Sequence, residues 1–142
     1  MRIVIDTNVA VSGLLWGGPP NQLLRWARDT ILDIVGCEET IDELRHVIEY
    51  ERFSERLSAL KITSSETMAY FMNLITFVPT PEYIPEAIHE DPFDNIFLAL
   101  ASESNAYLII SGDRHILDLG EYKRIQIVTP SEAVRVIKHL FK

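Results

Sequence analysis

The chain has 142 residues, of which 21 are acidic and 13 basic, so its formal net charge is −8. This length favours one domain over residues 1–142, and 47% hydrophobic with 24% charged residues is typical of a globular protein, not a disordered one. The acidic balance excludes a generally basic, sequence-independent coat for nucleic acid, but it is compatible with a local nucleic-acid site.

Short apolar, β-branched runs alternate along the chain with segments of helical spacing. The predicted strands, in chain order, cover residues 3–5, 31–35, 76–78, 107–110 and 125–128. The predicted helices cover residues 21–28, 38–51, 54–60, 64–74, 92–104 and 131–140. This alternation predicts an α/β domain whose parallel sheet is covered by helices on both faces.

The longest uncharged run, residues 7–24, approaches the length of a bilayer span. Two glycines and two prolines at 17–20 interrupt it, and a lipid-facing helix does not tolerate such a break. Asp6 likewise interrupts the apolar stretch that a signal peptide needs. The one cysteine, Cys37, excludes an internal disulfide and a cysteine-based zinc site. We therefore expect no membrane segment and a reduced, cytoplasmic protein.

Acidic residues lie where predicted strands end or predicted helices begin. In a parallel α/β sheet, ligands bind beyond the carboxyl ends of the strands. Asp6 follows the first strand, and Glu43 lies on the helix after the second. Asp94 opens the long apolar helix, and Asp113 follows the fourth strand. The topology therefore predicts that these four carboxylates meet at one edge of the sheet.

Each acid also has a purely structural interpretation. Asp6 and Asp113 can act as N-caps, and Asp91, followed by Pro92, has the pattern of a helix start. Asp94 has support from the helix dipole, but its helix is apolar on all sides and therefore buried, which places the carboxylate at an interior cleft.

Two positions for the helix that carries Glu43 remain open. Thr40 and Glu43 have the spacing of a capping box, in which the glutamate reaches back to the backbone N–H of the threonine. Alternatively, the helix begins near Glu38, and Glu43 projects from its second turn.

The joint pattern favours a metal site. Clustered carboxylates repel one another unless a cation lies between them. Oxygen donors without cysteine, and without a histidine pair at ligand spacing, suit Mg²⁺ or Mn²⁺. Two such ions roughly 3.5–4 Å apart activate water and stabilise both oxygens of an in-line phosphodiester cleavage. The four acids thus predict metal-assisted hydrolysis without a protein nucleophile.

Four strings of the sequence, taken in order, resemble the PIN-domain ribonucleases, and among them the VapC-like toxins of bacterial and archaeal toxin–antitoxin pairs. They are residues 4–9 (VIDTNV), Glu43 with Leu44, residues 91–101 (DPFDNIFLALA) and residues 108–117 (LIISGDRHIL). Each string alone is weakly specific. All four in this order, over nearly the whole chain, are strongly specific.

The resemblance implies a fold and a site. The fold is a five-stranded parallel sheet of order 3-2-1-4-5 between helices, which places the first and fourth strands side by side. The metal-binding acids map onto Asp6, Glu43, Asp94 and Asp113. The residues that would orient these carboxylates, or add to them, are Asn8, Thr7, Ser111 and Asp91.

Two positions depart from the family pattern. Cys37 stands where many members carry serine or threonine, which weakens the cap expected before the helix of Glu43. Asp91 adds a fifth acid, which we interpret first as a helix cap and second as a possible metal ligand.

The leading hypothesis is a Mg²⁺- or Mn²⁺-dependent endoribonuclease that acts as the toxin of a toxin–antitoxin pair. Its implied partners are RNA, a cognate antitoxin protein and further copies of itself in a homodimer or higher oligomer. One alternative is a non-catalytic PIN-fold protein that binds RNA or serves as a scaffold. Another is a small phosphohydrolase or phospho-acceptor domain, but the usual phosphatase has a second acid two residues after the first, at the position of Asn8 in this chain.

Overall fold

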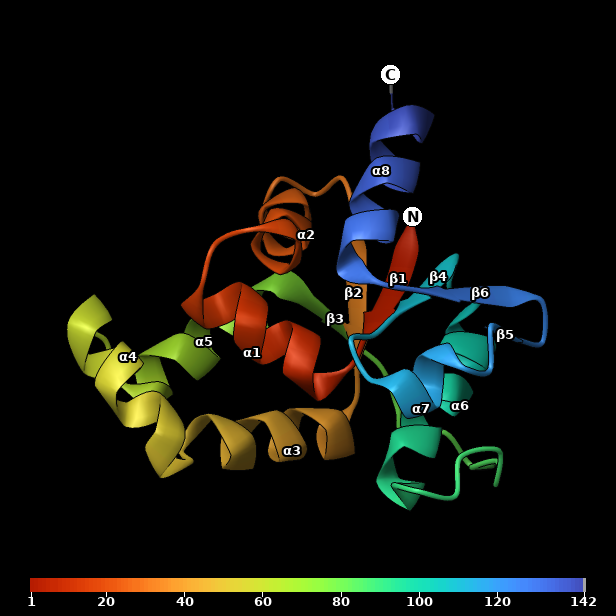
Figure 1. The fold of residues 1–142 in the computed structure, drawn as a ribbon, viewed down its shortest axis with the longest axis horizontal. Helices are drawn as coiled ribbons and strands as arrows, with labels where there is room; N and C mark the ends of the chain where they lie inside the picture. Colours follow the sequence, from red (N-terminus) through yellow and green to blue (C-terminus); the bar gives the residue numbers. More distant parts are fainter. Residues whose placement is uncertain (142) are drawn as a thin grey trace.

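Six strands form one sheet in the computed structural model, which describes residues 1–141. The sheet order is β3-β2-β1-β4-β6-β5 (Figure 1). The strand bounds are β1 Arg2–Ile5, β2 Asp33–Gly36, β3 Ile75–Phe77, β4 Leu108–Ile110, β5 Glu121–Tyr122 and β6 Ile125–Val128. All neighbouring strands pair in parallel except β5, which runs antiparallel to β6. The α/β class is therefore as predicted.

Helices precede or follow nearly every strand. The α-helices are α1 Thr7–Leu15, α2 Pro19–Arg28, α3 Glu38–Ile48, α4 Ser54–Leu60, α5 Ser64–Leu74, α6 Asn95–Ser104, α7 Arg114–Leu117 and α8 Pro130–Leu140. Two 3-10 turns, η1 Glu51–Phe53 and η2 Pro92–Asp94, complete the set in residues 1–141. In Figure 1 the starts of α1, α3 and α7 gather at the lower end of β1.

Alternation along the central strands divides the core into two layers, because successive strand side chains point to opposite faces. Ile3 and Ile5 of β1 pack with apolar side chains of α1, α2, α3, α5 and α8. Val4, between them, packs on the other face with α6 and α7. The sheet is thus covered on both faces, as predicted.

The prediction of five strands in a wholly parallel sheet was wrong. The additional strand, β5, is the first arm of a tight hairpin with β6, and Lys123 and Arg124 at its tip have φ of 46° and 69°. Two positive φ values are the signature of a type I′ turn, which usually needs glycine or asparagine. The sequence therefore carries no turn signal at this hairpin.

The second strand begins two residues later than predicted. The backbone N–H groups of Ile31 and Leu32 donate to the carbonyl of Trp26 and close the end of α2, at 2.9 and 3.3 Å. Groups used in this way cannot join the sheet, so β2 starts at Asp33 although Ile31 and Leu32 have strong strand preference.

The predicted helix over residues 38–51 is also shorter than expected. Tyr50 has φ −59° and ψ 140°, an extended backbone that ends the helical region after Ile48 and separates it from η1. This break separates α3 from the turn that carries Arg52.

Candidate active site

A polar cavity of about 180 Å³ opens at the carboxyl ends of β1 and β4. The side chains that line it are Asp6, Thr7, Asn8, Glu43, Val47, Tyr50, Arg52, Asp91, Asp94 and Asp113. All four predicted acids and Asp91 therefore share one cavity. The neighbouring pair β1 and β4 supplies two of them, because both strands end at this edge of the sheet.

Asp6 is the most buried acid of the cavity, with 4% of its surface exposed. Its Oδ1 accepts a hydrogen bond from the backbone N–H of Val9 at 2.8 Å, so it caps α1. Its Oδ2 accepts from the hydroxyl of Ser111, which is fully buried. Burial raises the pKa of the Asp6 carboxyl, while the bonds from Ser111 and Val9 act in the opposite direction.

Ser111 joins the two acids that follow β1 and β4. Its hydroxyl donates to Asp6 and accepts from the backbone N–H of Asp113 at 2.9 Å. The Asp113 carboxylate accepts from the N–H of His115 at 2.7 Å and caps α7. Both caps considered from the sequence therefore form, and the same carboxylates also line the cavity.

Glu43 lies on the second turn of α3. The helix begins at Glu38, and the hydroxyl of Thr40 accepts from the backbone N–H of Cys37 at 3.0 Å. The capping box between Thr40 and Glu43 therefore does not form, and the alternative with an earlier helix start is correct. Glu43 therefore has no capping role and lines the cavity.

The helix cap expected from Asp91 is not observed in residues 1–141. Asp91 precedes η2 but makes no side-chain capping bond, and its carboxylate faces the cavity beside Asp94. Asn95 fixes this turn: its side chain accepts from the N–H of Ile88 at 2.8 Å and donates to the carbonyls of Ile88 and Pro92 at 2.9 and 3.0 Å.

The carboxylates of the cavity repel one another. The pKa of Asp94 is raised to about 7, first by burial and then by the negative charges of Asp91, Asp113, Asp6 and Glu43. Four separate carboxylates therefore act on this one group. A cation between them would relieve the repulsion.

The donor set fits a hard divalent cation. The cavity is lined by carboxylates from five acids and by no histidine or cysteine, which is the oxygen-rich chemistry that Mg²⁺ and Mn²⁺ favour. Within residues 1–141, no three histidine, cysteine, aspartate or glutamate side chains are close enough to form a ready-made ligand group. The acids surround a common space, and some of them would have to turn inward to share an ion.

The other predicted positions differ in their contacts. Thr7 and Asn8 line the cavity on the first turn of α1, and Asn8 is exposed. In the described part of the chain neither side chain makes a hydrogen bond with an acid, whereas Ser111 bonds directly to Asp6.

Sequence reasoning missed Tyr50 and Arg52. Glu43 and Val47 are four residues apart on α3 and so share one face of the helix, whereas Tyr50 lies beyond the last helical residue, Ile48. That spacing extends the cavity wall beyond Glu43. The position of Arg52 follows from the chain break at Tyr50, which no residue pattern indicates.

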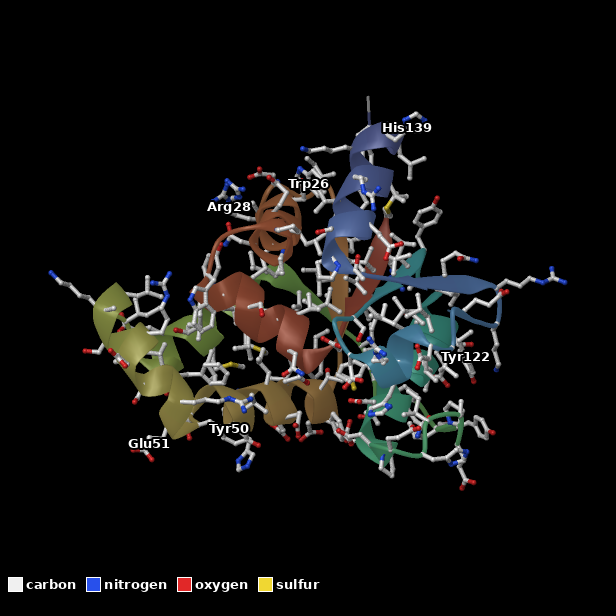
Figure 2. All side chains as sticks on the ribbon, viewed as in Figure 1. Trp26, Arg28, Tyr50, Glu51, Tyr122 and His139 are labelled. Atoms are coloured by element: carbon white, nitrogen blue, oxygen red, sulfur yellow. The ribbon has the colours of Figure 1, made fainter. Side chains whose placement is uncertain are left out.

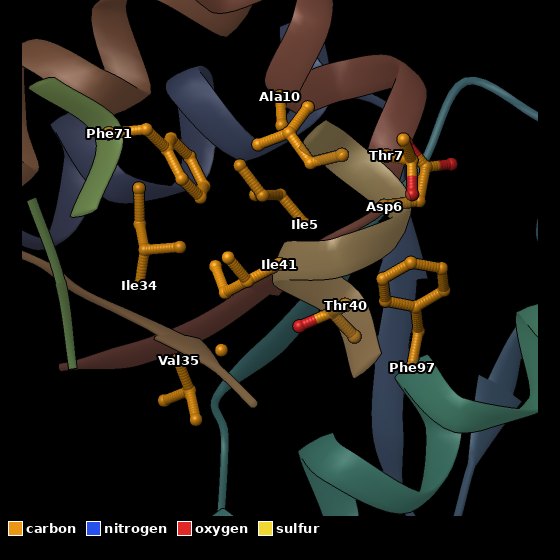
Figure 3. A pocket seen from close by; sticks show the side chains of 12 residues that line it. Ile5, Asp6, Thr7, Ala10, Ile34, Val35, Thr40, Ile41, Phe71 and Phe97 are labelled. Atoms are coloured by element: carbon orange, nitrogen blue, oxygen red, sulfur yellow. The ribbon is translucent and has the colours of Figure 1, made fainter. Parts of the chain in front are cut away.

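A smaller cavity of about 20 Å³ lies behind Asp6 (Figure 3). Figure 3 shows Asp6 and Thr7 at one end and Ile34 and Phe71 at the other. Its walls are mostly apolar, so it offers a ligand few polar contacts. It surrounds the inner side of Asp6 with apolar groups, which is consistent with the raised pKa of that carboxyl.

The comparisons agree with this geometry. The family model described as PIN domain matches residues 2–115, and the chain belongs to the PIN domain family. The PIN fold is generally a nuclease fold, and its nucleases generally use divalent metals. No curated protein matches the chain.

A solved structure shares the fold. The crystal structure of PAE2754 from Pyrobaculum aerophilum superposes with a TM-score of 0.65 over 98% of this chain and 90% of that one, at 13% sequence identity. At this identity the likeness concerns the fold alone. In residues 1–141, no helix is both long and apolar enough to cross a membrane.

Proposed function

We propose that the protein is a Mg²⁺- or Mn²⁺-dependent endoribonuclease that hydrolyses RNA phosphodiester bonds. The observation that carries this proposal is the convergence of five carboxylates on one polar cavity at the switch point of a PIN-family sheet. Of the hypotheses considered, metal-assisted phosphodiester hydrolysis makes the most direct use of such a set of oxygen donors.

The residues that would hold the metal are Asp6, Glu43, Asp94 and Asp113, with Asp91 as an additional candidate. When bound, the metal supplies activation of water and stabilisation of charge on the phosphate oxygens. Ser111 holds the Asp6 carboxylate in place, and the capping bond to His115 does the same for Asp113. With its pKa raised to about 7, the Asp94 carboxyl is only partly ionised near neutral pH, and a bound cation favours the ionised form, so metal affinity should rise with pH.

RNA cleavage by the purified protein tests the proposal. We expect cleavage of single-stranded or structured RNA with Mn²⁺ or Mg²⁺ and none with EDTA. Asp6→Ala and Asp94→Ala should abolish it, whereas Asp42→Ala should not, because Asp42 is exposed on α3 and pairs with Arg45 at 3.0 Å. Full activity in both site variants would show that the site assignment is wrong. RNA binding without turnover under every divalent metal would favour the non-catalytic alternative.

We further propose that the enzyme is the toxin of a toxin–antitoxin pair. The resemblance to VapC-like proteins and the net charge of −8, which suits a partner with basic residues, support this role. Expression of the wild type should arrest growth, Asp94→Ala should not, and co-expression of a small protein encoded beside it should restore growth. Normal growth with an active enzyme would indicate a nuclease of another role.

A further inference from the structure

Arg52 stands out in the wall of the acidic cavity. Of the described residues, it is the only basic one that lines this space, which five carboxylates also line. An arginine in such a position ordinarily pairs with an acid. The ion pairs in residues 1–141 are Arg28–Asp29, Arg45–Asp42 and His115–Glu90, so Arg52 has no carboxylate partner there.

Two aromatic rings hold the Arg52 guanidinium instead. Its central carbon lies 4.8 Å from the ring centre of Phe53 and 5.3 Å from that of Tyr50. In the described part of the chain the guanidinium makes no hydrogen bond, so its contacts with the two rings leave its N–H groups available. Arginine is suited to this arrangement because its weakly hydrated, planar group stacks on rings and presents a fork of donors.

The ring platform is itself anchored to the body of the domain. Phe53 makes an edge contact with Trp16 at 6.2 Å between ring centres. Arg56 lies over the Trp16 ring at 5.5 Å and donates from Nε to the carbonyl of Leu15 at 2.7 Å. The turn that carries Arg52 is therefore tied to the end of α1, which reduces the entropy that Arg52 would lose on binding an anion.

We propose that Arg52 is a binding residue for RNA and holds a backbone phosphate next to the bond that is cleaved. This inference rests on the proposed ribonuclease function. A strand that enters a cavity lined by carboxylates is repelled unless cations meet its phosphates, and Arg52 is a cation in the wall of this cavity. The guanidinium fork matches the oxygens of a phosphate, and Tyr50 and Phe53 act as positioning residues for it.

The first test compares steady-state RNA cleavage with Mn²⁺ by the wild type, Arg52→Ala, Arg52→Lys and Arg28→Ala. Arg28 is the matched control, because it is exposed on α2, far from Tyr50 in Figure 2. We expect Arg52→Ala to raise KM about tenfold with little change in kcat, since a charge-assisted contact is lost. Arg52→Lys should recover part of the loss, and Arg28→Ala should behave as the wild type.

The second test is salt dependence, which counts phosphate contacts. The slope of log(kcat/KM) against log[KCl] should be shallower by about 0.7 in Arg52→Ala, as expected for one contact to a single strand. The slope of Arg52→Lys should stay near that of the wild type. The Mn²⁺-induced rise in Tm should be equal in all variants, because Arg52 acts on RNA and not on the acids.

Three results would overturn the inference: an unchanged KM, an unchanged salt slope, or a loss confined to kcat together with a changed Mn²⁺ effect on Tm. If Arg52→Ala does not fold, Arg52→Gln takes its place.

If the wild type binds labelled RNA without cleaving it, the proposed function fails. Fluorescence anisotropy of the same variants with that RNA then still decides whether Arg52 contributes. If the wild type neither binds nor cleaves RNA, both proposals fail.

Discussion

The two halves of the acidic cavity are held in different ways. The strand-side half consists of Asp6 and Asp113, which follow β1 and β4, together with the buried Ser111 behind them, and the three residues share four hydrogen bonds through side-chain oxygens. The helix-side half consists of Glu43, Asp91 and Asp94, on α3 and around η2. In residues 1–141, no hydrogen bond reaches the carboxylates of that half, although Asn95 fixes the backbone beside two of them.

Burial accounts for the donors around Asp6, whereas Asp113, which is half-buried like Asp94 and Glu43, is held by its capping bond at the start of α7. A carboxylate as buried as Asp6 is costly unless donors surround it, whereas the half-buried Asp94 and Glu43 keep contact with solvent. The strand-side half therefore sets fixed oxygen positions, and the helix-side half can adjust its side chains around a ligand. The comparison separates residues that define where a metal binds from residues that close around it.

Ser111→Ala should have the largest effect, because it disrupts the strand-side half. It leaves Asp6 with one donor fewer and the N–H of Asp113 without its acceptor. We expect a loss of about 2 kcal/mol in the free energy of unfolding, measured by urea denaturation, and Mn²⁺ affinity lower by about 10–100-fold.

The matched control for Ser111 is Ser104→Ala. Ser104 is also buried, but its hydroxyl donates to the carbonyl of Leu100 within α6, away from the cavity. Its Mn²⁺ affinity should equal that of the wild type. If both serine variants bind Mn²⁺ equally well, the strand-side half is not held by Ser111.

Asp94→Asn should act on stability in the opposite direction. In EDTA at pH 8 the wild type carries a carboxylate whose pKa is raised to about 7, so the neutral amide should stabilise the fold. Asp94 is only half-buried, so solvent screening reduces the expected gain to about 1 kcal/mol. Added Mn²⁺ should raise the Tm of the wild type far more than that of the variant. A lower Tm for Asp94→Asn in EDTA would contradict repulsion within the cavity.

The pH dependence of that difference follows from the sign of the shift. Below about 4 the Asp94 carboxyl is protonated in both the folded and the unfolded chain, so wild type and Asp94→Asn should differ least. Between 4 and 7 the unfolded chain releases the proton first, so the wild type loses stability as pH rises. Above 7 the difference should be constant. Urea denaturation in EDTA from pH 4 to 8 measures it, and a difference that shrinks as pH rises would contradict the raised pKa.

The strand-side half, including the capping bonds of Asp6 and Asp113, was largely predictable from sequence, whereas the bond between Ser111 and Asp6 was not predictable from the local pattern. Asp6 and Asp113 follow apolar runs at the carboxyl ends of parallel strands, where a topological rule already places ligands. The bond between Ser111 and Asp6 joins residues 105 positions apart and depends on the parallel pairing of β1 with β4. The local pattern does not specify that pairing, and only the family resemblance suggested it.

The helix-side half was less predictable, because its determinants lie in the turns. The role of Asp91 depended on whether a capping bond forms at η2. Outside this half, the position of Arg52 depended in the same way on the extended backbone at Tyr50. The hairpin at Lys123 and Arg124 was missed for the same reason. Residue patterns indicate periodic elements well, but a turn held by its tertiary surroundings leaves no periodic signal.

The smallest effect is expected for Asp91, and it separates the two interpretations of this residue. A helix cap would lose stability in Asp91→Ala and regain it in Asp91→Asn, because asparagine caps as well as aspartate. Since Asp91 makes no capping bond, both variants should instead lie within about 0.5 kcal/mol of the wild type in EDTA.

The same two variants also test the effect of Asp91 on Asp94. Among the negative charges that raise the pKa of Asp94, that of Asp91 has the largest effect, so both variants should lower that pKa. Each Asp91 variant is compared with the same variant that also carries Asp94→Asn. The loss of stability with rising pH that is due to Asp94 should then be complete at a lower pH than in the wild type. If Asp91 contributes a metal contact, both variants lose it. The Mn²⁺ concentration that gives half-maximal cleavage should then rise a few-fold, and equally in the two variants. A stability loss in Asp91→Ala but not in Asp91→Asn would show that Asp91 acts as a helix cap. The helix-side half would then contain one fixed acid.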